Sequence, residues 1–285
     1  MVKNKILVVA GMHRSGTSVV TQWLKKCGLN VGDELIGAGT GNEQGHFEDV
    51  DFLRAHQSLL RSHRLTDTGF TEAVKQLTDR QKELLNDIIN HKNSFNQQWG
   101  WKDPRTCLFL DSYRQLIPEA FYLVVLRDHV SVVSSLIRRI YNRTEKKYAS
   151  RKGFSKFIWE HIKKKRRMRM LLKKHSGRYL KMWIAYNEAI LQHLQQVPPD
   201  NYLVIDYRSL YNNDKEIFDL LTHHWGFELD FFQFKNIYRD NLMHAAIDIN
   251  EYIKDKSLLG WAAAIETSMK QLSIFNNKQQ VLEAV

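Results

Sequence analysis

Residues 6–28, ILVVAGMHRSGTSVVTQWLKKCG, carry the clearest indication of fold in this 285-residue chain. The stretch opens with a short apolar, β-branched run, which is typical of a strand buried on both faces of a parallel sheet. Glycines and small polar residues follow, and then Val20, Trp23, Leu24 and Cys27 recur at the spacing of one helix face before Gly28. The predicted unit is a strand, a turn and a helix whose positive N-terminal end favours an anion in the turn.

The turn comes close to the nucleotide-binding pattern G-x-x-x-x-G-K-[ST]. Gly11 and Gly16 stand at the required spacing, but Thr17 occupies the position of the lysine that reaches the β- and γ-phosphates of a nucleoside triphosphate. The motif therefore predicts an anion site and raises the question of which phosphate ligand needs this loop without its lysine.

Composition favours one globular domain over residues 1–285. The hydrophobic content is 43%, enough for a large core, and the apolar runs are too short to cross a membrane. The first residues read as a strand rather than a cleavable signal, and Cys27 and Cys107 show neither metal-ligand spacing nor a disulfide framework. We expect a cytoplasmic protein with no metal site and with both cysteines in the core.

Basic residues are concentrated in one segment. Residues 138–174 contain sixteen Lys and Arg against two acids, whereas the whole chain has a net charge of +11. Its apolar residues recur at near-helical spacing: Phe154, Phe157, Ile158, Ile162, Met168, Leu171 and Leu172. This spacing predicts a helical excursion with Lys163 to Arg167 on or beside its exposed face. A solvated face, an anionic substrate such as an acidic glycan, an anionic membrane surface and RNA all suit this charge.

The remaining chain alternates between strand and helix patterns. Strands are predicted from Trp99 into the turn at Pro104, over 121–126 and over 202–205; helices are predicted over 52–60, 71–91, 130–137 and 179–197. This alternation predicts an α/β fold, a three-layer sandwich with a central parallel sheet and helical additions. Ligands in such folds bind at the carboxyl ends of the strands, where this sequence places residues 11–18, Lys102 to Arg105, Arg127 and Tyr207.

These motifs resemble the sulfotransferases that use 3′-phosphoadenosine 5′-phosphosulfate (PAPS), a family with the P-loop kinase-like fold. The family's phosphate loop is similar to Arg14 to Ser18, and its second signature is an Arg at a strand end with a Ser eight residues on, as in Arg127 and Ser135. Bacterial-type, tyrosylprotein and glycan members also resemble the chain in Asn42 to Glu48, Lys102 to Pro104 and Trp183 to Leu210. The resemblance covers residues 6 to 226.

The resemblance implies a site for the donor. The loop residues Gly11, His13, Arg14, Ser15, Gly16, Thr17 and Ser18 would hold the 5′-phosphosulfate, with His13 contributing mainly its backbone. Arg127 and Ser135 would bind the 3′-phosphate, and Tyr207 would lie near the adenine. A phosphosulfate has no γ-phosphate, so the P-loop lysine and its Mg²⁺ are not needed, and Arg14 takes over the charge.

The chemistry requires a base for the acceptor hydroxyl and a cation for the leaving oxygen. By resemblance we assign the base to Glu48, with His46, Asp49 and Asp103 as alternatives, and the cation to Lys102 together with Arg14. Two structural interpretations stay open: Glu48 as an acid at a helix N-terminus, and Lys102 as an ion-pair partner of Asp103. Arg105 is interpreted as a scaffold or substrate contact.

The sequence thus predicts in-line transfer of a sulfuryl group from PAPS to a hydroxyl, or secondarily to an amine, with 3′-phosphoadenosine 5′-phosphate (PAP) as product. Small molecules, glycans and lipids are all acceptable acceptors, peripheral membrane contact is compatible with the charge, and a nucleic-acid partner is not expected. The alternatives are a nucleotide or small-molecule kinase on the same fold, and a non-catalytic binding protein that uses the basic segment. Oligomeric state is left open.

Overall fold

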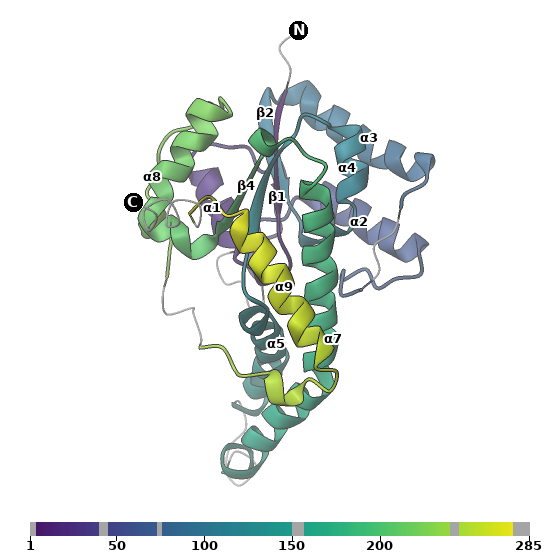
Figure 1. Ribbon diagram of the computed structural model, residues 1–285, viewed down its shortest axis with the longest axis vertical. Coiled ribbons are helices and arrows are strands. Elements are labelled where there is room, and N and C mark those ends of the chain that lie inside the picture. The colour runs from purple at the N-terminus through teal and green to yellow at the C-terminus, as the bar shows by residue number, and fades with distance from the viewer. Residues whose placement is uncertain (1–3, 40–44, 73–75, 150–156, 240–244, 276–285) are drawn as a thin grey trace.

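A parallel four-stranded sheet forms the centre of the described part of the molecule (Figure 1). The computed structural model describes residues 4–39, 45–72, 76–149, 157–239 and 245–275, so Asn42 and Phe154 lie outside the described residues. The strands are β1 (Lys5–Ala10), β2 (Gln98–Lys102), β3 (Phe121–Leu126) and β4 (Tyr202–Asp206), in the spatial order β2-β1-β3-β4. This order puts the phosphate-loop strand β1 between two neighbours and brings the four carboxyl ends to one edge.

Helices cover both faces of the sheet, as the three-layer prediction requires. The longer helices are α1 (Thr17–Lys26), α2 (Val50–Ser62), α3 (Asp79–Phe95), α4 (Leu110–Leu116), α5 (His129–Ala149), α7 (Lys164–Leu194), α8 (Leu210–Asp219) and α9 (Ser257–Gln271). Short 3₁₀ or π segments connect several of them, including η1 (Pro104–Leu108) after β2 and η2 (Trp159–Lys163) before α7.

Strand alternation divides the apolar core into two parts. Leu7 and Val9 of β1 point to the face covered by α1 and α8, whereas Ile6, Val8 and Ala10 point to the face covered by the other long helices. Each face of the strands is apolar because both are buried, which explains the continuous β-branched runs in the sequence. Cys27 and Cys107 are free and buried in these cores, as predicted.

Three helices differ from the predicted limits, and one of them, predicted over 130–137, is α5 and continues to Ala149. The polar helix predicted over 71–91 begins at Asp79, where the Thr78 hydroxyl and the Gln81 side chain form a capping box. The helix predicted over 179–197 is the C-terminal part of α7, a single helix of 31 residues. In the basic segment Leu171 and Leu172 are buried as expected, but Phe157 is 54% exposed, so the apolar face does not extend to that position.

The basic segment projects beyond the sheet as a helical arm (Figure 1). We call the described residues 138–149 and 157–174 the arm: α5 runs outward, and η2 and α7 return, with α5 and α7 packed together. Lys163 to Arg166 are exposed on it, in agreement with the predicted solvent face, whereas Arg167 is half-buried. Because α5 starts directly after β3, the arm connects to the carboxyl edge of the sheet.

Candidate active site

The phosphate loop, residues 11–18, joins the end of β1 to the first turn of α1. Glycine is required at position 16, where φ is +95° and an added Cβ would lie 2.5 Å from the Tyr207 ring. Arg14 has a φ of +72°, a left-handed conformation that is uncommon for a residue with a side chain. Since α1 begins at Thr17, the N–H groups of its first turn lie at this loop and suit an anion.

Hydrogen bonds connect the loop to the end of β3 and to α5. Arg14 Nε donates to Ser135 Oγ at 2.9 Å, and Arg127 Nη1 donates to the Arg14 carbonyl oxygen at 2.9 Å. The carbonyl oxygen of Arg127 accepts a hydrogen bond from Trp183 Nε1 at 3.1 Å. The guanidinium carbon of Arg127 lies 5.7 Å from the centre of the Tyr207 ring. The structure therefore brings together the loop, Arg127, Ser135 and Tyr207, which the sequence placed on four separate segments.

Positive charge is concentrated around these residues. Burial, followed by the neighbouring charges of Arg139 and Arg127, lowers the pKa of Arg14 to about 10. Arg14 still carries its proton at neutral pH, so the guanidinium groups of Arg14, Arg127 and Arg139 repel one another. An anionic ligand would relieve that repulsion.

A cavity of about 290 Å³ opens over the loop. Most of the predicted site residues line it: His13, Arg14, Gly16, Thr17, Ser18, Glu48, Lys102, Arg127, Ser135 and Tyr207. Gly11 and Ser15 do not; both are buried members of the loop, and a Cβ at Gly11 would lie 2.8 Å from the Val125 carbonyl oxygen. These two residues therefore shape the loop rather than its surface.

Glu48 and Lys102 form an ion pair at the wall of this cavity. Glu48 lies just before α2 and Lys102 ends β2, and Glu48 Oε1 is 3.1 Å from Lys102 Nζ. Glu48 Oε2 also lies 3.8 Å from Arg105 Nη1, and Lys102 Nζ donates to the His46 carbonyl oxygen at 2.6 Å. Burial lowers the pKa of Lys102, and Glu48 opposes that shift. The pair holds a carboxylate and an ammonium group next to the phosphate loop.

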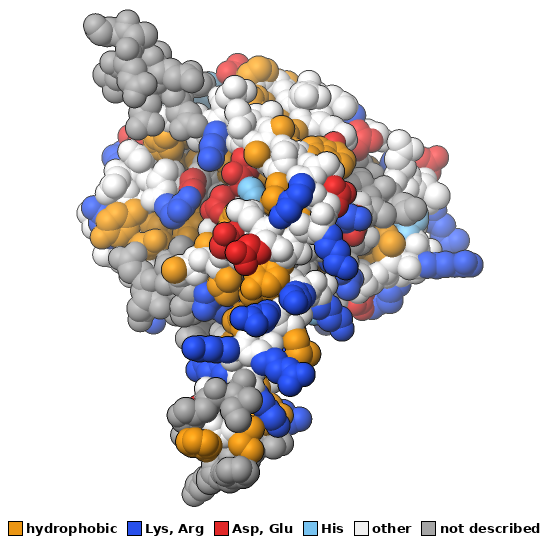
Figure 2. Space-filling model, turned by 60° about the horizontal axis from the view of Figure 1, so that its bottom comes forward, with side chains coloured by type: hydrophobic (Ala, Val, Ile, Leu, Met, Phe, Trp, Pro, Cys, Tyr) orange, Lys and Arg blue, Asp and Glu red, His pale blue; other side chains and the backbone are white. Residues whose placement is uncertain are grey.

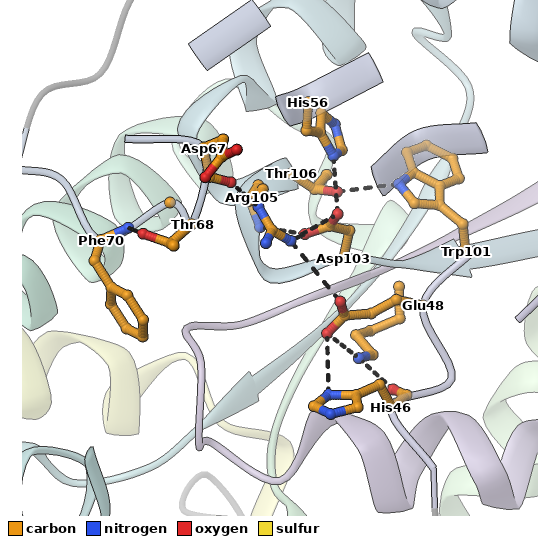
Figure 3. A network of polar contacts seen from close by, with 12 residues as sticks. His46, Glu48, His56, Asp67, Thr68, Phe70, Trp101, Asp103, Arg105 and Thr106 are labelled. Atoms are coloured by element: carbon orange, nitrogen blue, oxygen red, sulfur yellow. Dashed lines mark hydrogen bonds and ion pairs between the residues drawn. The ribbon is translucent and has the colours of Figure 1, made fainter. Parts of the chain in front are cut away.

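Figure 3 shows that Arg105 links Glu48 to a buried polar network. Arg105 Nη1 lies 3.0 Å from Asp103 Oδ1, and His56 Nδ1 lies 3.3 Å from Asp103 Oδ2. Burial opposes the ionisation of Asp103, but Arg105 and His56 hold its pKa well below the usual range. On the far side His56 Nε2 lies 2.7 Å from the Tyr113 hydroxyl. Arg105 occupies a scaffold position, one of the two roles considered for it.

The four candidate bases fall into two groups. Glu48 and His46 line the cavity, whereas Asp49 and Asp103 do not. Asp49 caps α2 by accepting from the N–H groups of Asp51 and Phe52, and its Oδ2 lies 3.0 Å from Lys92 Nζ. The cap is thus Asp49 rather than Glu48, and the partner of Lys102 is Glu48 rather than Asp103.

The His13 ring packs against Phe70, with the two ring centroids 4.9 Å apart. Burial and then the charge of Arg105 lower the pKa of His13 to about 3, so the imidazole is neutral at physiological pH. His13 also lines the cavity, and its role through the loop backbone stays a prediction.

Several cavity residues were not predicted from the sequence. Arg138, Arg139 and Asn142 extend the cavity along α5, and a later segment adds Ile237, Tyr238 and Arg239. The residues on α5 follow Ser135 at three, four and seven positions, so helical spacing from Ser135 could have found them. The later segment carries no periodic pattern or motif that would have marked it.

A known family model matches most of this chain. The model of the sulfotransferase family, Sulfotransfer_3, matches residues 7–230. The chain belongs to the sulfotransferase family. The match includes the phosphate loop, Glu48, Lys102, Arg127, Ser135 and Tyr207. A search of curated proteins finds no significant match to this sulfotransferase.

One solved sulfotransferase shares the fold of this chain, and two others show lower similarity. Sulfotransferase STF9 from Mycobacterium avium is similar with a TM-score of 0.61 and 12% sequence identity, over 94% of this chain and 77% of that chain. The sulfotransferase domain from the Synechococcus PCC 7002 olefin synthase gives a TM-score of 0.47 and 16% identity, over 93% of this chain and 96% of that one. The sulfotransferase domain from the curacin biosynthetic pathway gives a TM-score of 0.48 and 12% identity, over 93% of this chain and 97% of that one.

Two further properties concern the described residues alone. In the part of the chain that the structure describes, no group of three or more His, Cys, Asp and Glu side chains is arranged to hold a metal ion. None of the described helices of this sulfotransferase is both long and apolar enough to span a bilayer.

Proposed function

We propose that this sulfotransferase moves a sulfuryl group from PAPS to the hydroxyl of an acceptor and releases PAP. The observation that carries the proposal is the meeting of Arg14, Arg127 and Ser135 at one cavity that begins at the phosphate loop. A nucleotide with phosphates at both its 5′ and 3′ positions needs two anion-binding sets, and these residues supply both.

The residues present fit each phosphate of the donor. The start of α1 and the hydroxyls of Thr17 and Ser18 suit the 5′-phosphosulfate, since both hydroxyl-bearing residues line the cavity. Arg127 and Ser135 suit the 3′-phosphate, and Tyr207 contributes an aromatic wall. A lysine at position 17 would serve a γ-phosphate, which this donor lacks.

Glu48 and Lys102 have the chemistry that the transfer requires. In the proposed reaction the acceptor oxygen forms a bond to sulfur as the bond from sulfur to the 5′-phosphate oxygen breaks. Glu48 takes the acceptor proton, and Lys102 balances the negative charge that develops on the leaving oxygen. The same ammonium group pairs with Glu48 at 3.1 Å, so one cation serves both the base and the leaving group.

Titration calorimetry of the full chain with PAP and with ATP tests the donor. We expect PAP to bind tightly and ATP to bind at least tenfold more weakly, because Arg127 and Ser135 recognise a phosphate that ATP lacks. Preference for ATP would favour a kinase, and binding of neither nucleotide would favour a non-catalytic binding protein.

A further inference from the structure

A second concave surface lies on the arm, next to the candidate active site. This groove, of about 550 Å³, is formed by α5, η2 and the first turns of α7. Its charged lining consists of Arg143, Lys147, Lys163, Arg166 and Arg167, and the described residues that line it include no carboxylate. Figure 2 shows the Lys and Arg side chains gathered over the arm.

The groove continues the cationic wall of the active-site cavity along α5. Arg139 lines the cavity, whereas Arg143 and Lys147 line the groove. The three residues are four positions apart and therefore share one helix face, over about 12 Å at 1.5 Å per residue. Burial and then the charge of Arg143 lower the pKa of Arg139, which shows that this row of cations repels itself.

Two guanidinium groups, Arg139 in the cavity and Arg167 in the groove, have unused hydrogen-bonding capacity. Arg139 Nε and Arg167 Nε are both buried, and neither donates a hydrogen bond to any residue in the described part of the chain. Buried donors normally have partners, and a guanidinium selects carboxylate, phosphate or sulfate groups. The cavity and the groove together therefore have both the charge and the unpaired Nε donors for an anionic ligand.

We infer that the groove binds the distal part of the acceptor, and that the acceptor is an acidic oligosaccharide. This inference rests on the proposed function. The reacting hydroxyl of the acceptor lies at Glu48, and anionic groups farther along the oligosaccharide lie against Arg143, Lys147 and Arg167. A flexible chain that carries both hydroxyls and repeated negative charges matches a cavity and a groove joined by one helix face.

The groove is less suited to RNA or to a membrane. Trp159 and Tyr148 stack on each other with ring centres 4.3 Å apart, and Trp159 is 4% exposed, so these rings do not offer free faces to bases. The cations line a concave groove between helices. A bilayer surface is flat and would contact the projecting parts of the arm rather than this groove.

Binding of fluorescent oligogalacturonates of increasing length, measured by anisotropy at low salt, tests the inference. The groove variant is Arg143→Gln with Lys147→Gln, both at exposed positions, so folding should be preserved. Its matched control is Lys173→Gln with Arg178→Gln, which removes the same two charges from exposed positions of α7 that do not line the groove. Polyuridylate, neutral maltooligosaccharides and phosphatidylglycerol vesicles serve as competing partners.

We expect the groove variant to bind oligogalacturonate roughly 3- to 30-fold more weakly, as for the loss of two exposed ion pairs, and the control to change less than about twofold. Affinity should rise with chain length and fall with salt. Equal losses in both variants, absence of binding, or stronger binding to polyuridylate or vesicles would overturn the inference. PAP affinity, measured on the same samples, should be unchanged; a wild-type protein that does not bind PAP would instead overturn the proposed function.

Discussion

Glu48 is a carboxylate held between two cations, Lys102 and Arg105, beside the phosphate loop. This arrangement fixes its orientation while leaving it on the cavity wall, where an acceptor can reach it. Arg105 is itself fixed by the fully buried Asp103, so the position of Glu48 depends on residues that do not touch the ligand. Such support is what a base needs if it is to act without reorganisation.

Glu48→Gln keeps the shape of this side chain and removes its ability to accept a proton. We expect kcat to fall about 10²- to 10⁴-fold for a hydroxyl acceptor, with PAP affinity nearly unchanged. Steady-state kinetics and PAP titration measure the two effects separately. Full activity in the variant would transfer the role of base to His46, the other candidate on the cavity wall.

In the proposed function, Arg127 binds the donor and takes no part in the transfer step. Arg127→Ala should weaken PAP binding by about 1.5–3 kcal/mol, the range for a hydrogen bond to a charged group, which is about 10- to 150-fold. Arg80→Ala, at an exposed position of α3, provides a control with the same loss of charge. Calorimetry that finds equal PAP affinity in the two variants would contradict the role of Arg127.

At the scale of elements, the start of α2 depends on Asp49. This residue caps the helix and pairs with the buried Lys92, away from the cavity. Asp49→Asn loses the ion pair but keeps an acceptor for the N–H groups, whereas Asp49→Ala loses both. We expect the free energy of unfolding of the alanine variant to be lower by about a further 1 kcal/mol.

Urea unfolding of both variants measures that difference, and Asp51→Ala is the control, because Asp51 also pairs with Lys92 but does not cap the helix. We expect kcat per folded molecule to stay at the wild-type level in all three. A large loss of kcat in Asp49→Asn, with stability preserved, would return Asp49 to the candidate bases.

Elements with strong local patterns could be predicted from the sequence. The runs at Ile6 and Phe121 alternate between two buried faces and form strands. Arg127, directly after β3, and Ser135, on α5, both line the cavity. The segment at Ile237 to Arg239 has no such pattern, so it could not be predicted from the sequence. Its place in the cavity depends on long-range packing. The pairing of Glu48 with Lys102 is likewise a contact between residues 54 positions apart, which spacing alone could not distinguish from a pair with Asp103.

At the scale of the whole molecule, buried histidines make stability depend on pH. His193 packs against the Tyr122 ring with centroids 4.4 Å apart, and neither of its ring nitrogens has a hydrogen-bond partner in the described part of the chain. Burial, and then the charge of Arg114, lower the pKa of His193 to about 4. Between pH 6.5 and 4 the unfolded chain therefore binds a proton at His193 that the folded chain does not, and stability falls as pH falls.

We expect His193 to account for a loss of about 2 kcal/mol in the free energy of unfolding between pH 7.5 and 5.0. Urea unfolding at the two pH values should show this loss in wild type and a smaller one in His193→Phe, which fills the site without titrating. His223→Gln, at a histidine that is 79% exposed, should keep the wild-type difference. Equal pH dependence in wild type and His193→Phe would contradict this source.

The contacts of Arg14 have a consequence for how fast a ligand is captured. Its side chain donates a hydrogen bond to Ser135, and its carbonyl oxygen accepts one from Arg127. The loop is therefore hydrogen-bonded to α5 and to the residue after β3 before a nucleotide binds. Such a preorganised receptor spends little conformational entropy on binding, and encounter is governed by electrostatic steering rather than by loop closure. Amide exchange over residues 11–18 should then be slow in the free protein and slow only slightly further with PAP, while the association rate falls steeply as ionic strength rises.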